Sequence, residues 1–254
     1  MSNKKQHATK KLKDISANEI ALLGGHYRLL GYLDYLAARL LLRNGLEIQG
    51  LILASTSIEK YLKAVLATAG KATATHLDSD GLVEILQQCG RDVLPHISRS
   101  FLQYLGRAYA FRYLETHSGP ASIAVEQRKL LAELDYSVSH FESSLTKTVN
   151  GVIQKTGYAV AVEARDRRIW DDNYILVGTS KSDFVEVYCT LYCIAIRPMH
   201  PAIELRHENF KSVNDASFDF PKTTYGGYKV NIEFGAPVEG GAFNPPIPNV
   251  APSK

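Results

Sequence analysis

The first 150 residues alternate long stretches of periodic apolar residues with short polar breaks. From Asn18 to Asn44 leucines recur at steps of three or four residues, and no proline interrupts them. This pattern predicts a helix that ends at Asn44-Gly45, two residues that adopt the left-handed conformation readily. We expect Gly24-Gly25 to break this helix or to delay its start.

A second helix is predicted to follow and to run to Gly70. Glu59 and Lys63 stand one turn apart in it, in the favoured acid-before-base order, and are expected to form an exposed ion pair. That pair accounts for both charges without any ligand. The residues of its apolar stripe are Ile48, Leu51, Ile52, Ser55, Ile58, Leu62, Val65 and Leu66.

Three more helices complete the expected arrangement. A short one covers residues 82–88 and ends at Gly90. A third long helix begins near Ile97 and continues to about His117, because Gly119-Pro120 cannot extend it. A fourth follows, with Ile123, Leu130, Leu134, Val138, Phe141 and Leu145 on one face. Long helices with short links predict an antiparallel bundle of four to five helices over residues 18–150.

After Asn150-Gly151 the chain changes to short runs of β-branched and aromatic residues, at 158–162, 174–177, 184–196 and 228–234. In the longest run, alternate residues from Val185 to Ala195 form an apolar face, and Tyr188 and Tyr192 belong to a wetter one. We therefore predict a small antiparallel β-rich region of unknown role over 151–235 and a Pro/Gly-rich tail over 236–254. The predicted fold class is α+β.

Composition narrows the kind of protein. No apolar run approaches the roughly 18 to 20 residues that span a bilayer, and the N-terminus lacks the apolar segment of a signal peptide, so we expect a cytoplasmic protein without membrane association. Cys89, Cys189 and Cys193 are too few for a disulfide framework and are expected to be reduced thiols. The formal net charge is +3, and five lysines lie in residues 1–17, interpreted as a basic disordered leader that also attracts polyanions.

Two segments resemble the first two helices of HEPN domains. They are residues 34–45 and 57–66, and the match is best over 58–64, Ile-Glu-Lys-Tyr-Leu-Lys-Ala. His76-Leu77 in the next link and a short helix before the third long one agree with the order of elements in that family. The resemblance covers about residues 18–148. It implies a homodimer that processes or binds RNA or nucleotides, of toxin-antitoxin or defence type, with room for an antitoxin-type protein partner.

Active HEPN ribonucleases carry an arginine, four to six residues, and then a histidine at the end of the third long helix. Arg112 and His117 fit this spacing with four residues between them. The resemblance therefore implies a metal-independent endoribonuclease that needs no cofactor, with Arg112 and His117 as its catalytic pair. Two positions depart from the pattern. Tyr113 stands where active members usually have a polar residue. Gly119 stands where some toxin members have a modified tyrosine.

The residues themselves make Arg112 unusual. It continues an apolar strip formed by Phe101, Leu105 and Ala108, so its guanidinium needs an acidic partner, a helix end, a subunit interface or a phosphate. His117, in the last turn, would feel the negative end of the helix dipole, which favours its protonated form. Five residues rotate a helix by roughly 140°, so the two side chains of one copy do not face the same phosphate. A twofold dimer through the third-helix region would bring two copies into one cleft.

In such a cleft the imidazole would take the proton of the RNA 2'-hydroxyl and the guanidinium would steady the phosphate, so that DNA would not be cleaved. Arg107, Lys60 and Lys63 are further expected contacts to phosphate or RNA. Two alternatives remain open. In one, Arg112 pairs with Glu115 or Asp135 and His117 caps a helix end. In the other, a non-catalytic HEPN module binds nucleotides or RNA through the same cations.

Two other groups of polar residues give weaker indications of a functional site. His200, Glu204 and His207 have a loosely metal-like spacing, but Pro201 argues against a helix that would gather them, so no metal is expected. Asp171-Asp172 beside Trp170 predict a turn between two strands.

Overall fold

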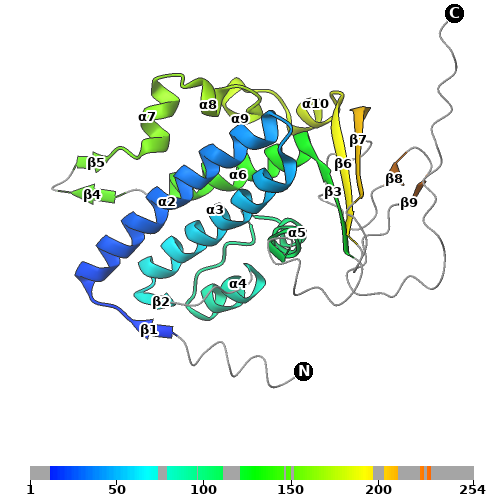
Figure 1. Cartoon of the computed structure of the whole chain (residues 1–254). Helices are drawn as coiled ribbons and strands as arrows, with labels where there is room; N and C mark the ends of the chain where they lie inside the picture. Colours follow the sequence, from blue (N-terminus) through cyan, green and yellow to red (C-terminus); the bar gives the residue numbers. More distant parts are fainter. Residues whose placement is uncertain are drawn as a thin grey trace, which may run out of the picture.

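The computed structural model describes residues 12–73, 79–95, 97–110, 121–145, 147–149, 152–196, 203–210, 224–225 and 228–229. Within them the chain is mostly helical with small antiparallel sheets, an α+β arrangement (Figure 1). The helices are α2 (Ala17–Arg43), α3 (Glu47–Thr68), α4 (Ser79–Gln88), α5 (Arg99–Ala110), α6 (Gln127–Ser144), α7 (Gly157–Glu163), α8 (Arg167–Trp170), α9 (Tyr174–Val177) and α10 (Lys181–Val185).

The described strands form four separate sheets. β1 (Leu12–Asp14) pairs with β2 (Lys71–Thr73), β4 (Lys147–Val149) with β5 (Val152–Gln154), and β8 (Thr224–Tyr225) with β9 (Tyr228–Lys229). The largest sheet has the order β3 (Ala121–Glu126), β6 (Cys189–Ile196) and β7 (Ile203–Phe210), all antiparallel. The expected leader over 1–17 is therefore too long, because 12–14 is a strand. Residues 1–11 and the predicted tail lie outside the described residues.

The hairpin of α2 and α3 confirms the first two predicted helices. Ser16 and Glu19 form a capping box at the start of α2, in which the Ser16 amide donates to the Glu19 carboxylate at 2.8 Å. This bond, the Ser16 hydroxyl and Lys13 lower the pKa of Glu19 to about 2. The predicted break at Gly24-Gly25 is wrong. The cap starts the helix before them, and Gly24 packs closely on α3, where an added Cβ would lie 3.8 Å from the Ala67 Cβ.

The fourth long helix begins later than predicted. Residues 121–126 form β3, so Ile123 lies in a strand opposite Ile194 rather than on a helix face. Ile123 and Val125 are buried, and β-branched residues suit a sheet whose partner comes from much further along the chain. Helix α6 then carries the rest of the predicted apolar face.

The prediction of strands in the first part of the 151–235 region is wrong. Residues 158–162 and 174–177 are helical, and Val185 ends helix α10, so the long strand begins only at Cys189. A side chain caps each of these short helices, namely Thr156, Asn173 and Ser180. Tyr192, expected on the wetter face, is buried and donates a hydrogen bond to the Gly45 carbonyl at 3.2 Å.

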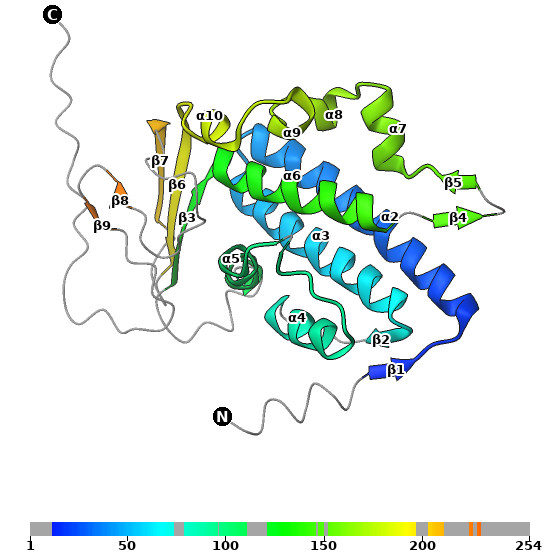
Figure 2. The ribbon, with the colours of Figure 1, turned by 180° about the vertical axis from the view of Figure 1, so that it is seen from behind.

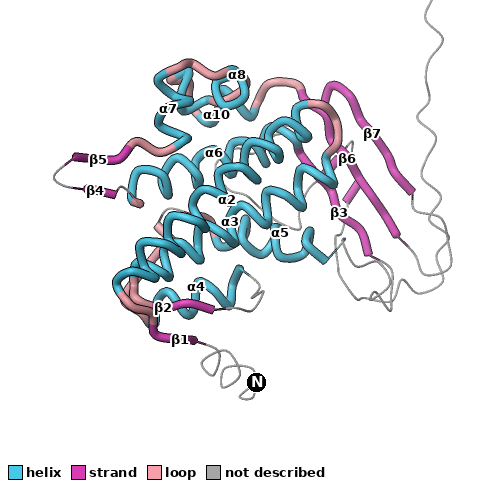
Figure 3. Tube along the Cα trace, turned by 60° about the vertical axis from the view of Figure 1, so that its left-hand side comes forward, coloured by secondary structure: helices cyan, strands magenta, loops and turns pink. Residues whose placement is uncertain are grey.

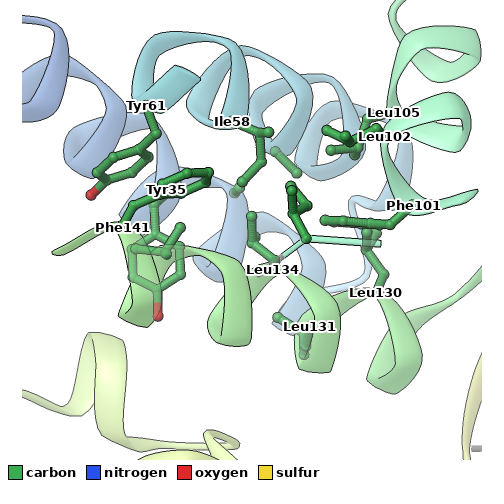
Figure 4. Packing of buried hydrophobic residues seen from close by; sticks show 14 of the residues in the cluster. Tyr35, Ile58, Tyr61, Phe101, Leu102, Leu105, Leu130, Leu131, Leu134 and Phe141 are labelled. Carbon is green, nitrogen blue, oxygen red and sulfur yellow. The ribbon is translucent and has the colours of Figure 1, made fainter. Parts of the chain in front are cut away.

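One hydrophobic cluster joins residues on both sides of position 150. Figure 4 shows Phe101 of α5 beside Leu130 of α6, with Leu105 higher up, level with Ile58 of α3. The Tyr61 and Phe141 rings stack with centroids 5.5 Å apart. Seen from behind, α7 to α10 lie along one side of the α2–α6 layer, and α4 and α5 lie on the side of α3 (Figure 2). The β3–β6–β7 sheet stands at one end of the bundle (Figure 3).

None of the helices in the described part of the chain combines the length and the apolar character that a membrane crossing requires.

Candidate functional site

The predicted catalytic pair, Arg112 and His117, lies outside the described residues, as does Tyr113. Helix α5, which leads to it, is described to Ala110. Its apolar strip is confirmed, because Phe101, Leu105 and Ala108 are all buried. The Tyr104 hydroxyl donates to the Ala124 carbonyl at 2.9 Å, which ties α5 to β3. The apolar strip therefore packs into the core as far as Ala108.

The three predicted phosphate contacts occupy different settings. Lys60 Nζ donates to Asp34 Oδ2 at 2.6 Å, and Lys63 Nζ donates to Glu59 Oε1 at 2.6 Å. The Glu59–Lys63 pair is thus confirmed, but the expected exposure is wrong, because the two side chains are only 11% and 9% exposed. The Tyr27 ring of α2 lies 6.0 Å from Lys63 Nζ. Arg107 is exposed in the last turn of α5, on another element.

The structure contains a buried ion pair that the sequence did not predict. Arg39 of α2 and Asp135 of α6 have fully buried side chains, and Arg39 Nη1 donates to Asp135 Oδ2. The Tyr35 hydroxyl donates to the other carboxylate oxygen, Asp135 Oδ1, at 2.9 Å. Both oxygens of Asp135, considered above as a partner of Arg112, are therefore used within the α2–α6 layer.

The same guanidinium holds the segment around α8. Arg39 Nε donates to the Arg168 carbonyl at 3.1 Å, and Nη2 donates to the Asp171 carbonyl. Asp171 and Asp172 form a turn, as predicted, but between α8 and α9 rather than between strands. Arg43 Nε donates to Asp172 Oδ2 at 2.9 Å and fixes this turn from outside.

Burial and mutual attraction shift the pKa values of Asp135 and Arg39. Burial raises the pKa of the Asp135 carboxyl, and hydrogen bonds from Arg39 and Tyr35 oppose this shift. Burial alone would lower the pKa of Arg39, but the adjacent Asp135 outweighs it, so the net shift is upward and the guanidinium stays charged. The sequence does contain a sign that Arg39 is buried. Arg39 continues the three- and four-residue steps of Tyr32, Tyr35 and Leu42, which form the buried face of α2.

An open hollow of about 730 Å³ lies where α3 and α6 end beside the first half of α2. Its size is in the range of ligand sites, roughly 300 to 1,000 Å³. Arg28 lies in its wall and donates from Nη1 to the Leu145 carbonyl at 2.5 Å. The lining residues are Ala17, Ile20, Ala21, Gly24, Gly25, Arg28, Ala64, Val65, Thr68, Gly90, Arg91, Asp92, Val93, His140, Phe141, Ser144 and Leu145.

Gly25 is the residue that could have indicated this hollow from the sequence. A glycine inside a helix costs about 1 kcal/mol relative to alanine, and a Cβ at Gly25 would meet nothing within 4 Å. The protein itself therefore does not require the glycine for packing, and its absent side chain leaves the hollow wider. The lining includes the cations Arg28 and Arg91 and the carboxylate Asp92. The two cations suit a ligand with an anionic group.

Among the described residues, no three His, Cys, Asp or Glu side chains are close enough to hold a metal ion. Glu204 and His207 lie in strand β7, and His200 is not described. The thiols of Cys89, Cys189 and Cys193 are free. Burial raises the pKa of Cys193 to about 11, so this thiol stays protonated near neutral pH.

No family model matches this sequence, and no curated protein and no solved structure matches the chain.

Proposed function

We propose that the protein is a homodimeric, metal-independent endoribonuclease of HEPN type, with Arg112 and His117 as its catalytic pair. The observation that supports this most is the order of elements, two long paired helices, the short α4, and then α5 leading to Arg112. The Ile-Glu-Lys-Tyr-Leu-Lys-Ala stretch that resembles the family lies in α3. Arg107, exposed in the last turn of α5, adds a cation near the same end of that helix.

The chemistry follows from the two side chains. His117 removes the proton from an RNA 2'-hydroxyl, which then attacks the adjacent phosphorus. Arg112 binds the non-bridging oxygens and stabilises the charge that develops on them. DNA lacks the attacking group and is not cut. Each cleft takes its arginine from one copy and its histidine from the other, because one helix does not direct both groups to one phosphate.

We predict that the purified protein cleaves labelled RNA in EDTA, and that Arg112→Ala and His117→Ala each lower the rate by about 100- to 10,000-fold. Lys155→Ala is the matched control, because Lys155 forms an exposed ion pair with Glu163 on α7. The control should cleave at the wild-type rate, and all four proteins should show the same melting temperature. Equal background cleavage in wild type and both active-site variants removes the ribonuclease.

Mixing the two inactive variants tests the shared cleft. In a dimer of one Arg112→Ala chain and one His117→Ala chain, one of the two clefts keeps both native groups. Random exchange of subunits therefore restores about a quarter of the wild-type rate. If each chain supplied both groups to its own site, the mixture would stay inactive.

The hollow favours a second candidate function, a non-catalytic module that binds a nucleotide. Its size fits such a ligand, and Arg28 and Arg91 supply charge for a phosphate. We expect Arg91→Ala to weaken AMP or ATP binding by about 10-fold in calorimetric titrations, from the loss of one charged contact. Lys155→Ala should leave the affinity unchanged. If the nucleotides bind wild type and Arg91→Ala equally, or bind neither, the hollow is not a nucleotide site.

A further inference from the structure

Helix α2 is apolar on the side that faces away from the core. We call this side the outer leucine face and define it as Leu22, Leu29, Leu30, Leu33 and Leu40. These side chains are 57%, 52%, 45%, 49% and 54% exposed. The opposite side of the same helix is buried against α3 and α6. A helix that is apolar all round is normally covered on all sides.

The leucines are aligned along the helix. At about 100° per residue, Leu22, Leu29, Leu33 and Leu40 fall within an arc of about 40°. They span eighteen residues, so the stripe is about 27 Å long at 1.5 Å per residue. This length and direction suit a second helix laid along α2.

Charged side chains leave the face free. Three charged residues of α2 bond to other parts of the same chain. Arg28 donates to the Leu145 carbonyl, and Asp34 accepts from Lys60. Arg43 donates to Asp171 and Asp172. The exposed positions of the helix other than the leucines are Ala17, Asn18, Ala21, Gly25 and His26. A helix that lies on a lipid surface usually carries a Lys/Arg-rich polar face. The outer leucine face has no such flank in α2, which favours a protein partner.

The exposed area of the outer leucine face is large enough for a protein interface. At roughly 80 Å² of exposed surface per half-buried leucine, the five side chains offer about 400 Å², which is the size of the largest apolar patch on a typical monomer. With the neighbouring small residues and His26 the face reaches about 600 Å² per copy, near the lower end of specific interfaces. Such an interface forms a dimer whose population depends on concentration.

The spacing of the stripe identifies the partner. The intervals between Leu22, Leu29, Leu33 and Leu40 are seven, four and seven residues, which read the same in both directions about Gly31. A twofold axis at the level of Gly31 places Leu22 beside Leu40 of the other copy and Leu29 beside Leu33. A self-complementary patch is what a twofold dimer requires.

We propose that the outer leucine face binds α2 of a second copy of this chain, antiparallel, about a twofold axis at Gly31. This interface lies on α2, whereas the cleft proposed above involves the end of α5, so it does not rest on the proposed function. A chain that uses both surfaces assembles into a tetramer, and one that uses only this surface forms a dimer.

The test is the mass of the assembly by light scattering across a wide range of concentration. The double variant Leu29→Lys/Leu33→Lys should halve the mass, from dimer to monomer or from tetramer to dimer, because four like charges meet at the axis. The double variant Leu29→Glu/Leu33→Glu should behave in the same way. An equimolar mixture of the two should recover the wild-type mass, because each lysine then faces a glutamate. Val177→Lys, an exposed apolar position on α9, is the control and should keep the wild-type mass.

Register is tested by crosslinking. Leu22→Cys mixed with Leu40→Cys should give a disulfide-linked pair under mild oxidation, and neither variant alone should give one at these positions. A wild-type monomer at all concentrations overturns the proposal, as does a wild-type mass in both charged variants. Wild-type binding to phosphatidylcholine vesicles that the lysine variant loses would assign the face to lipid instead. RNA cleavage that persists in a lysine variant of unchanged mass would overturn this interface while leaving the proposed function intact.

Discussion

Replacing Asp135 by alanine is expected to lower the free energy of unfolding by about 3 to 5 kcal/mol, because it leaves the charge of Arg39 buried without its partner. Both side chains are fully buried, so water cannot replace the carboxylate. The Tyr35 hydroxyl also loses its acceptor, which adds the cost of an unsatisfied buried donor. The two carbonyls that Arg39 contacts cannot neutralise its charge.

The measurement is chemical denaturation followed by circular dichroism. Arg43→Ala is the matched control, because this arginine pairs with Asp171 and Asp172 at a partly exposed site and should cost no more than about 1 kcal/mol. The double variant Arg39→Met/Asp135→Leu should be more stable than Asp135→Ala, since it removes both charges together. A cost for Asp135→Ala as small as that of the control would show that the pair is not buried in solution.

Gly50→Ala is expected to destabilise the protein by about 2 to 3 kcal/mol through overpacking. A Cβ at this position would lie 2.7 Å from Leu42 Cγ and 3.0 Å from the Leu42 backbone nitrogen. Leu42 is fully buried, and its backbone nitrogen cannot shift without moving helix α2. The two helices α2 and α3 would therefore have to separate near their connection, which outweighs the better helix propensity of alanine.

Gly106→Ala gives the contrasting result. Gly106 also lies inside a helix, α5, but an added Cβ there would meet nothing within 4 Å. Alanine should therefore stabilise the protein by about 0.5 to 1 kcal/mol, through helix propensity alone. Thermal unfolding of the two variants beside wild type should show opposite shifts in melting temperature. Shifts of the same sign would contradict the close approach of α2 and α3 at Gly50.

Only part of the candidate site could be predicted from the sequence, namely the part that depends on neighbouring residues in the chain. The strip of Phe101, Leu105 and Ala108 could be predicted, because helical spacing places its members on one face. The hollow could not, because its wall comes from several separate segments of the chain. Arg39 was visible as a charge on an apolar face, but its partner Asp135 is on α6, and only packing shows which carboxylate lies within reach.

By itself the sequence determined the long helices, since α2 and α3 begin and end within a few residues of the predicted limits. Periodicity, the Ser16 cap and the turn at Gly45 act between near neighbours in the chain, so they can be read without knowing the fold. The tertiary structure decided which short apolar runs became strands. Residues 121–126 are a strand because β6 pairs with them, and residues 157–163 are a helix that buries Tyr158 beside Tyr35 of α2. Strand pairing and burial depend on partners distant in sequence, and a short apolar run is compatible with either structure until those partners are present.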